Sequence, residues 1–186
     1  HATGTCGVIG ATIAASYLLG FSEEERFRAF SAACVSSSGM LKVLDDGSEL
    51  KPYNVAKTAL LSLTSLQMAK AEFEGSSDPL GGRRGFFKMM TGVEHVELQP
   101  VLLNGTYAIM KTYTKPYASC RYTHPAVEAA IRLKHKYDIK FYNVLKVEIR
   151  TYDLAIPGHD HVVIPNSYSA KMSIPYATAV GLIFGK

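Results

Sequence analysis

The sequence predicts an α+β fold, in which an all-helical first part precedes a smaller, lid-type α+β domain with a short antiparallel sheet. Up to about residue 92, apolar side chains recur at three- and four-residue steps, the spacing of one helix face. After Gly92, two segments alternate apolar and polar residues, as half-buried strands do. A chain of 186 residues with a hydrophobic fraction of 47% can bury one sizeable core or two small ones. We therefore expect residues 1–96 to be part of a helical domain and residues 97–186 to be part of an α+β lid domain.

The first predicted elements are two helices joined by a short turn. Residues 5–19 are rich in small apolar side chains, and Gly20 is a typical stop signal. Ser22 with Glu25 three residues later is a capping box, which predicts that a second helix starts here and runs to about Ser36. The side chains of this second helix that we expect to be buried are Phe27, Phe30, Ala33 and Cys34.

Two further helices are predicted before the change of pattern. The longer one spans residues 53–73, and the short one lies at about residues 86–90. We expect one apolar face of the longer helix to be buried; its members are Ala56, Leu60, Leu63, Leu66, Ala69 and Phe73.

The second part of the sequence combines strands with helices. Asn104-Gly105 lies between "HVELQPVLL" and "TYAIMKTY" and predicts a hairpin turn. Residues 144–152 alternate regularly and predict a further strand. Pro125 favours a helix start and Tyr137 is its expected end. A last helix is expected at about residues 169–184, with Pro175 in its first turn or at a kink.

Composition and charge exclude some function classes. The net charge is +4 and the basic residues are scattered, so no phosphate track is visible and we expect no nucleic-acid partner. The apolar segment 7–19 is too short to cross a bilayer, so we expect no membrane partner. Three widely spaced cysteines fit a reducing compartment and therefore a cytoplasmic protein. A mildly positive field would suit a small polyanion such as a di- or tricarboxylate.

Three local motifs carry weak chemical signals. "GVIGATIAAS" lacks the full glycine pattern of a dinucleotide loop, and close helix packing explains its small residues better. His159, Asp160 and His161 form one H-x-H group, which is too small for a metal site without further ligands, so we expect no metal. Cys120 and His124 could form the thiolate–imidazole pair of a hydrolase, but no orienting group or oxyanion hole is visible.

The same tripeptide occurs in both halves of the chain. Lys51-Pro52-Tyr53 and Lys115-Pro116-Tyr117 each place a lysine just before a proline, which restricts the backbone beside the lysine. These are two ordinary solvated lysines, or two cations that converge on one anionic ligand. The residues alone leave both interpretations open.

Four stretches of the chain form an ordered set: "HATGTCGVIGATIAASYLLG"; "KPYNVAKTALLSLTSLQMA" with "GGRRGFF"; "KPYASCRYTHPAVEAAI"; and "SAKMSIPYATAVGL". In this order they resemble the MmgE/PrpD family, which includes 2-methylcitrate dehydratase, cis-aconitate decarboxylase and iminodisuccinate epimerase. The resemblance runs over essentially the whole chain. It implies an active-site cleft between a large helical domain and a smaller α+β lid, and a homodimer formed through the helical domain.

The resemblance also implies catalytic residues. His1 falls on the histidine that opens an H-x-x-x-x-x-G stretch lining the active site in relatives. Lys115 matches the lysine that opens the second domain, and His124 a histidine nine positions later. Tyr176 matches the tyrosine of an S-x-P-Y helix start. His1, Lys115, His124 and Tyr176 are therefore the expected catalytic residues.

Substrate-binding residues follow from the same match. Lys51 corresponds to the lysine before the long helix, and Cys120 falls where relatives vary between cysteine and histidine. Lys51, Lys115 and Cys120 are the expected substrate contacts. Lysines near a carboxylate stabilise the enolate-like charge that proton removal creates, and a histidine or tyrosine can exchange the proton.

The function implied is that of a lyase or isomerase that acts on a small di- or tricarboxylate without a cofactor. A hydro-lyase of the 2-methylcitrate dehydratase type is the first choice, since that activity names the family. Decarboxylation and epimerisation share the same early proton chemistry. Relatives are longer on both sides, so the chain is expected to be a central fragment. The alternative is a non-catalytic homologue, or a binding or assembly module that lacks a complete active site.

Overall fold

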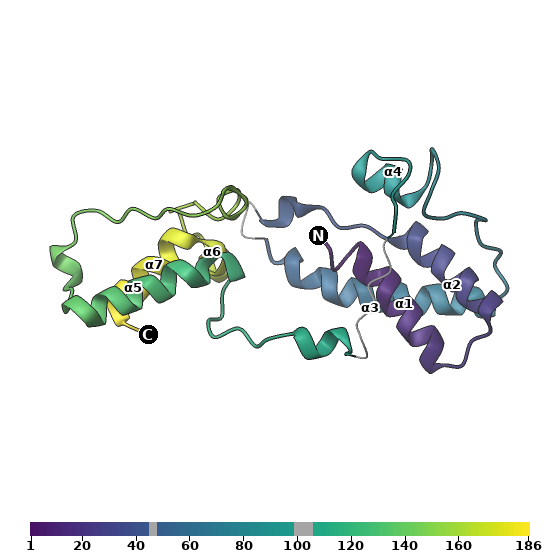
Figure 1. Cartoon of the computed structure of the whole chain (residues 1–186), viewed down its shortest axis with the longest axis horizontal. Coiled ribbons are helices and arrows are strands. Elements are labelled where there is room, and N and C mark those ends of the chain that lie inside the picture. Colours follow the sequence, from purple (N-terminus) through teal and green to yellow (C-terminus); the bar gives the residue numbers. More distant parts are fainter. Residues whose placement is uncertain (45–47, 99–105) are drawn as a thin grey trace. The chain divides into compact units, whose positions relative to one another are not determined.

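The computed structural model describes residues 1–44, 48–98 and 106–186, and the chain divides into two compact units. Unit 1 comprises His1–Met40 and Leu50–Thr106, and unit 2 comprises Leu41–Glu49 and Tyr107–Lys186 (Figure 1). Each unit is described by itself.

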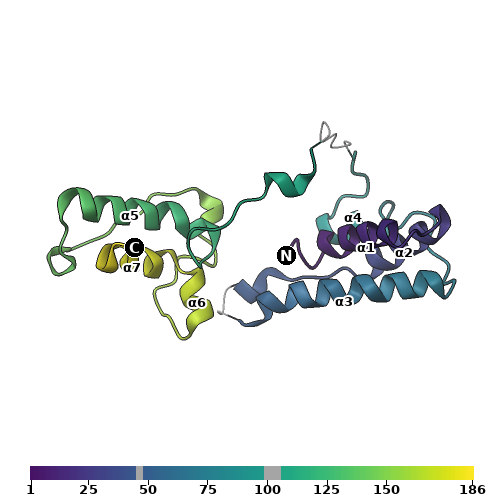
Figure 2. The same cartoon turned by 90° about the horizontal axis from the view of Figure 1, so that it is seen from below.

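Unit 1 is a bundle of three helices with a short fourth helix. The helices are α1 (Cys6–Leu18), α2 (Glu23–Ser36), α3 (Leu50–Lys70) and α4 (Phe86–Thr91). The first three helices pack against one another in all pairs, and they lie side by side in both views (Figures 1 and 2).

The turn between α1 and α2 forms as the sequence predicts. Gly20 has a positive φ of 66°, which glycine adopts without steric cost. The Ser22 hydroxyl accepts a hydrogen bond from the Glu25 amide at 3.2 Å, and the Glu25 carboxylate accepts one from the Ser22 amide at 2.7 Å. This capping box starts α2, because it satisfies two amides that have no partner inside the helix. The prediction for this helix start is confirmed.

The predicted burial of α2 is only partly right. Ala33 and Cys34 are buried, whereas Phe27 is 42% exposed. The core of unit 1 instead uses an aromatic side chain from the preceding turn together with small and aliphatic residues of α2 and α3: Phe21, Ala29, Leu66 and Ala69.

The predicted apolar face of α3 is only partly right: Leu66 and Ala69 are buried in the core, but other members are not. Leu60 and Leu63 are 62% and 59% exposed, whereas much of the buried face consists of small polar residues. Hydroxyl groups can be buried here because carbonyls accept from them: Ser62 Oγ donates to Thr58 O of its own helix at 2.8 Å, and Val8 O of α1 lies 3.2 Å from the same oxygen. Small side chains also allow α1 and α3 to approach closely. The polar residues buried on α3 are Asn54, Thr58, Ser62 and Ser65.

Unit 2 is built on two helices joined by long irregular segments. α5 (His124–Tyr137) lies beside α7 (Ile174–Phe184) in both views, and α6 (Ser167–Met172) precedes α7 (Figures 1 and 2). Helix α5 has Pro125 in its first turn and ends at Tyr137, as predicted. The described residues of unit 2 also contain short 3₁₀ helices: η1 (Leu41–Leu44), η2 (Ala108–Lys111), η3 (Arg121–Thr123), η4 (Phe141–Asn143) and η5 (Asp153–Ala155).

The predicted α+β lid domain with an antiparallel sheet is wrong. Across residues 1–44, 48–98 and 106–186 the structure contains helices and irregular segments and no strand. "TYAIMKTY" contains η2, and the turn at Asn104-Gly105 lies outside the described residues. Residues 144–152 have no regular secondary structure, because an alternating pattern gives a segment two faces but supplies no partner strand.

The predicted last helix is divided in two. Ser173 separates α6 from α7, and its hydroxyl accepts a hydrogen bond from the Tyr176 amide at 3.1 Å. Pro175 lies in the first turn of α7, where its missing N–H costs nothing.

Candidate active site

The loop from Lys115 to His124 brings a cation and an imidazole to one carbonyl oxygen. Lys115 Nζ donates to Ser119 O at 3.1 Å, and His124 Nε2 lies 3.4 Å from the same oxygen. A carbonyl oxygen can only accept, so a hydrogen bond here requires the proton on Nε2 of His124. Lys115 is exposed and can reach a ligand, whereas His124 is 3% exposed. Two of the predicted site residues are thus brought together.

The surroundings of His124 favour its neutral form. Burial lowers the pKa of His124 first, and the charges of Arg121 and Lys115 lower it further, although the hydrogen bond to Ser119 acts in the opposite direction. Its Nδ1 is buried without a partner among the described residues.

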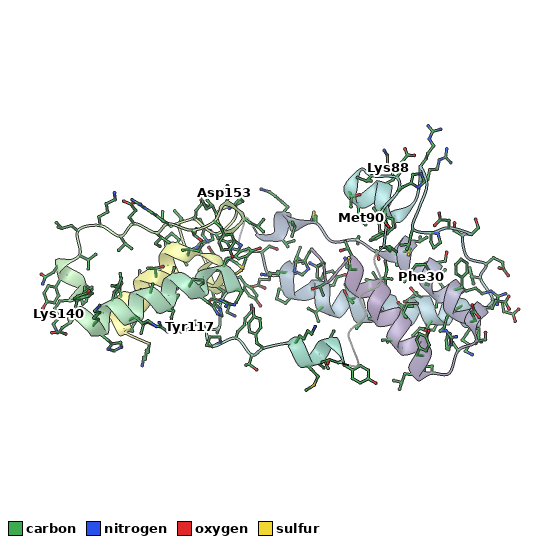
Figure 3. All side chains as sticks on the ribbon, viewed as in Figure 1. Phe30, Lys88, Met90, Tyr117, Lys140 and Asp153 are labelled. Atoms are coloured by element: carbon green, nitrogen blue, oxygen red, sulfur yellow. The ribbon has the colours of Figure 1, made fainter. Side chains whose placement is uncertain are left out.

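Tyr117 is fixed against the first turns of α5 by contacts with His124 and Glu128. Its hydroxyl donates to Glu128 Oε2 at 2.5 Å, and its ring meets the His124 ring edge-on at a centroid distance of 5.3 Å. Arg132 Nε donates to the other oxygen of Glu128 at 2.7 Å. The hydrogen bond raises the pKa of Tyr117 and lowers that of Glu128. Figure 3 labels Tyr117 on the segment that leads into α5, and these contacts attach this segment to the helix.

Tyr176 lines a pocket next to this loop. The pocket has a volume of about 330 Å³, and Tyr117, Ser119 and Lys171 also line it. Tyr176 is 43% exposed and its amide is bonded to the Ser173 hydroxyl. The partly exposed side chain of Tyr176 therefore lines the same pocket as Ser119 of the loop.

Cys120 pairs with a histidine other than the predicted one. Its Sγ lies 3.9 Å from Nε2 of His159, whereas His124 faces the Ser119 carbonyl. Nδ1 of His159 lies 2.8 Å from Met172 O, which again can only accept. Spacing along the chain could not reveal this pair, because 39 residues separate its members.

In unit 1 the structure places His1 and Lys51 in different local settings. His1 lies beside Gly39. A Cβ added at Gly39 would lie 3.0 Å from the His1 carbonyl oxygen. Lys51 is half-buried in the first turn of α3. Lys57, in the same helix, donates from Nζ to Ser38 O at 2.7 Å.

The weaker motifs have ordinary structural explanations. "GVIGATIAAS" lies within α1, where Val8 and Thr12 are fully buried. His161 Nε2 lies 2.9 Å from the Ser169 hydroxyl. Within the described part of the chain, no group of three or more His, Cys, Asp or Glu side chains could hold a metal ion. Within those same residues, no helix is both long and apolar enough to cross a bilayer.

Comparison with protein families gives two matches that together span most of the chain. A model of the MmgE/PrpD N-terminal domain matches residues 1–99, and a model of the MmgE/PrpD C-terminal domain matches residues 117–186. A comparison with individually curated proteins gives no match. The first match covers most of unit 1 together with Leu41–Glu49 of unit 2, and the second contains His124, Tyr176 and the Cys120–His159 pair.

Proposed function

Because the chain belongs to the MmgE/PrpD family, a family that includes lyases and dehydratases, we propose that it acts as part of a hydro-lyase on a small di- or tricarboxylate. The proposed substrate is 2-methylcitrate, and no cofactor takes part in the proposed chemistry. The convergence of Lys115 and His124 on Ser119 O is the observation that carries the proposal.

The proposed roles follow from exposure and charge. Lys115 binds a substrate carboxylate and stabilises the enolate-like charge that develops when the neighbouring carbon loses its proton. Lys115 is exposed and is the first residue of the loop, and both facts support this role. Tyr176, which is open to the adjacent pocket, exchanges the proton or protonates the leaving hydroxyl.

The other candidates take supporting or parallel roles. Burial of His124 supports a positioning role, in which the ring holds the Ser119 carbonyl and therefore the end of the loop. Lys51 and Cys120 contact the substrate, and His1 is a further proton-transfer group. These assignments extend the family match to single residues.

Steady-state kinetics of the full-length protein with Lys115→Ala test the proposal. The expected result is a fall of kcat/KM on 2-methylcitrate by about 100-fold, because one charge-stabilising group is lost. Lys140→Ala is the matched control, since Lys140 pairs with Asp138 on the surface of the same unit. It is expected to leave kcat/KM unchanged.

Substrates are compared by NMR in deuterated water with 2-methylcitrate, citrate, cis-aconitate and iminodisuccinate. This assay separates dehydration, decarboxylation and proton exchange in one experiment. An unchanged kcat/KM in Lys115→Ala would overturn the role of Lys115. Binding without any turnover by the wild-type protein would favour a non-catalytic homologue instead.

A further inference from the structure

The three cysteines of the chain stand in three different environments. Cys6 is exposed on α1, and Cys34 is buried in α2. Burial raises the pKa of the Cys34 thiol to about 11, which makes it unreactive at neutral pH. Cys120 is intermediate in exposure and lies at the start of η3, with a histidine ring beside its sulfur.

A hydrogen bond on the side of the ring away from Cys120 fixes the orientation of His159. Nδ1 must donate to Met172 O, because the carbonyl has no proton to give, and the two atoms are 2.8 Å apart. In a neutral ring, Nε2 is then the unprotonated nitrogen, and Nε2 is the atom that faces Cys120 Sγ at 3.9 Å. The tautomer therefore places a proton acceptor beside the thiol.

Both partners of the pair are held by long-range contacts. The Cys120 amide donates to Lys171 O at 2.7 Å, and the Ile174 amide donates to His159 O at 2.7 Å. The Tyr122 ring meets the His159 ring edge-on at 5.0 Å. His159 is only 2% exposed, so the ring has little freedom to turn away from the sulfur.

The geometry points to Cys120 and His159 as a thiol–imidazole pair in which His159 is the base, and therefore to Cys120 as the reactive thiol of the chain toward soft electrophiles. With a haloacetamide, the Cys120 sulfur forms a bond to the electrophilic carbon and the carbon–halogen bond breaks. The halide leaves with the bonding electrons, and the thiol proton moves to Nε2 of His159. Alkyl halides and activated alkenes are the class of reagent that such a thiol takes.

This inference goes beyond the proposed function, because it concerns the chemistry of the thiol and requires no turnover of a carboxylate. A failure of the hydro-lyase proposal leaves it standing, and its own failure leaves the roles of Lys115 and Tyr176 untouched.

Competition between the cysteines of one sample provides the test. The full-length wild-type protein is treated with iodoacetamide at pH 7, quenched at intervals and digested, and each cysteine is read by mass spectrometry. Cys120 is expected to react about tenfold faster than Cys6, although Cys6 is more exposed, because thiolate character outweighs access. Cys34 is expected to stay unmodified. Equal or slower reaction of Cys120 relative to Cys6 would overturn the inference without any variant.

Two matched variants identify the base. His159→Gln retains an N–H donor but lacks the imidazole base, and it is expected to lower the Cys120 rate to that of Cys6 or below. His161→Gln changes the histidine two positions away, whose Nε2 faces Ser169 instead, and it is expected to leave the Cys120 rate unchanged. Circular dichroism confirms that each variant is folded. A His159→Gln chain that is folded and reacts at the wild-type rate would exclude His159 as the base.

Discussion

Unit 1 and unit 2 both rest on packed helices, but different kinds of contact hold them. In unit 1 the start of α2 is local, because its capping box joins Ser22 and Glu25, which are three residues apart. In unit 2 the corresponding cap of α7 belongs to a long-range network: Ser173 Oγ accepts from the Tyr176 amide and donates to His161 O at 2.6 Å. The comparison shows that two serine caps of similar local form differ in their long-range contacts: one bonds only within its own helix, and the other also bonds to a distant segment.

The largest expected effect tests the tight packing of unit 1. A Cβ at Gly4 would come within 2.3 Å of Ser38 O, a backbone atom that cannot move alone. Gly4→Ala is therefore expected to destabilise the chain by about 3 kcal/mol, measured by urea unfolding. Gly10 is the control, since a Cβ there meets no atom within 4 Å.

Gly10→Ala lies inside α1 and is expected to stabilise the chain by about 0.5–1 kcal/mol, because alanine loses less backbone entropy. Equal effects of the two substitutions would contradict the close approach of the Gly4 segment to the end of α2.

The second prediction compares the two helix caps directly. Ser173 is fully buried and makes two hydrogen bonds, so Ser173→Ala leaves Tyr176 N and His161 O without partners. The expected loss is about 2 kcal/mol in the free energy of unfolding. Ser22 is exposed and serves its own helix, so Ser22→Ala is expected to cost about 1 kcal/mol. If the exposed cap proves more costly than the buried one, the distinction between local and tertiary caps does not hold.

The smallest effect concerns acidification. Because the pKa of His124 is lowered in the folded chain, the unfolded chain takes up its proton first as the pH falls. The stability from the neutral ring is therefore fully present above about pH 6.5 and is lost as the pH falls through the folded pKa. His124→Gln is expected to flatten the fall of the urea midpoint between pH 7.5 and 5.5.

Unit 1 supplies the reference for this titration. The pKa of Glu25 is lowered by Lys70 and by the Ser22 amide, so its contribution is lost only in the more acidic range, below the ordinary value of 4.5. In Glu25→Gln, the urea midpoint is expected to depend on pH between 7.5 and 5.5 in the same way as in the wild type. An identical pH profile for wild type and His124→Gln would show that His124 is not held neutral by the fold.

The predictions of helix starts and stops were right where one short stretch of sequence contains all the necessary information. The capping box at Ser22, the stop at Gly20 and the proline at the start of α5 each act within four residues, and the structure contains all three. The predicted burial of α3 was wrong for Leu60 and Leu63, for a different reason. A row of leucines predicts a buried face, yet the hydroxyls of Thr58 and Ser62 are buried instead, because each finds a carbonyl in its own helix.

The candidate site divides in the same way. Lys115 and His124 are close in sequence, and a loop of ten residues brings them to the Ser119 carbonyl. His159 could not be assigned to Cys120 from the sequence, since a lone H-x-H motif gives no indication of a partner 39 residues earlier. The ring is oriented by Met172 O, a backbone atom with no signature in the sequence.

By itself the sequence determined the helices of unit 1, the start of α5 and, through four ordered stretches, the family to which the chain belongs. These properties rest on short-range capping, on helical periodicity and on residues that can be read in order. The tertiary structure alone decided that residues 144–152 form no strand in the described part of the chain, which face of α3 is buried, and which histidine meets Cys120. Each of these depends on contacts with a segment that is distant in sequence. Such contacts, including hydrogen bonds to backbone atoms, produce no periodic pattern in the sequence.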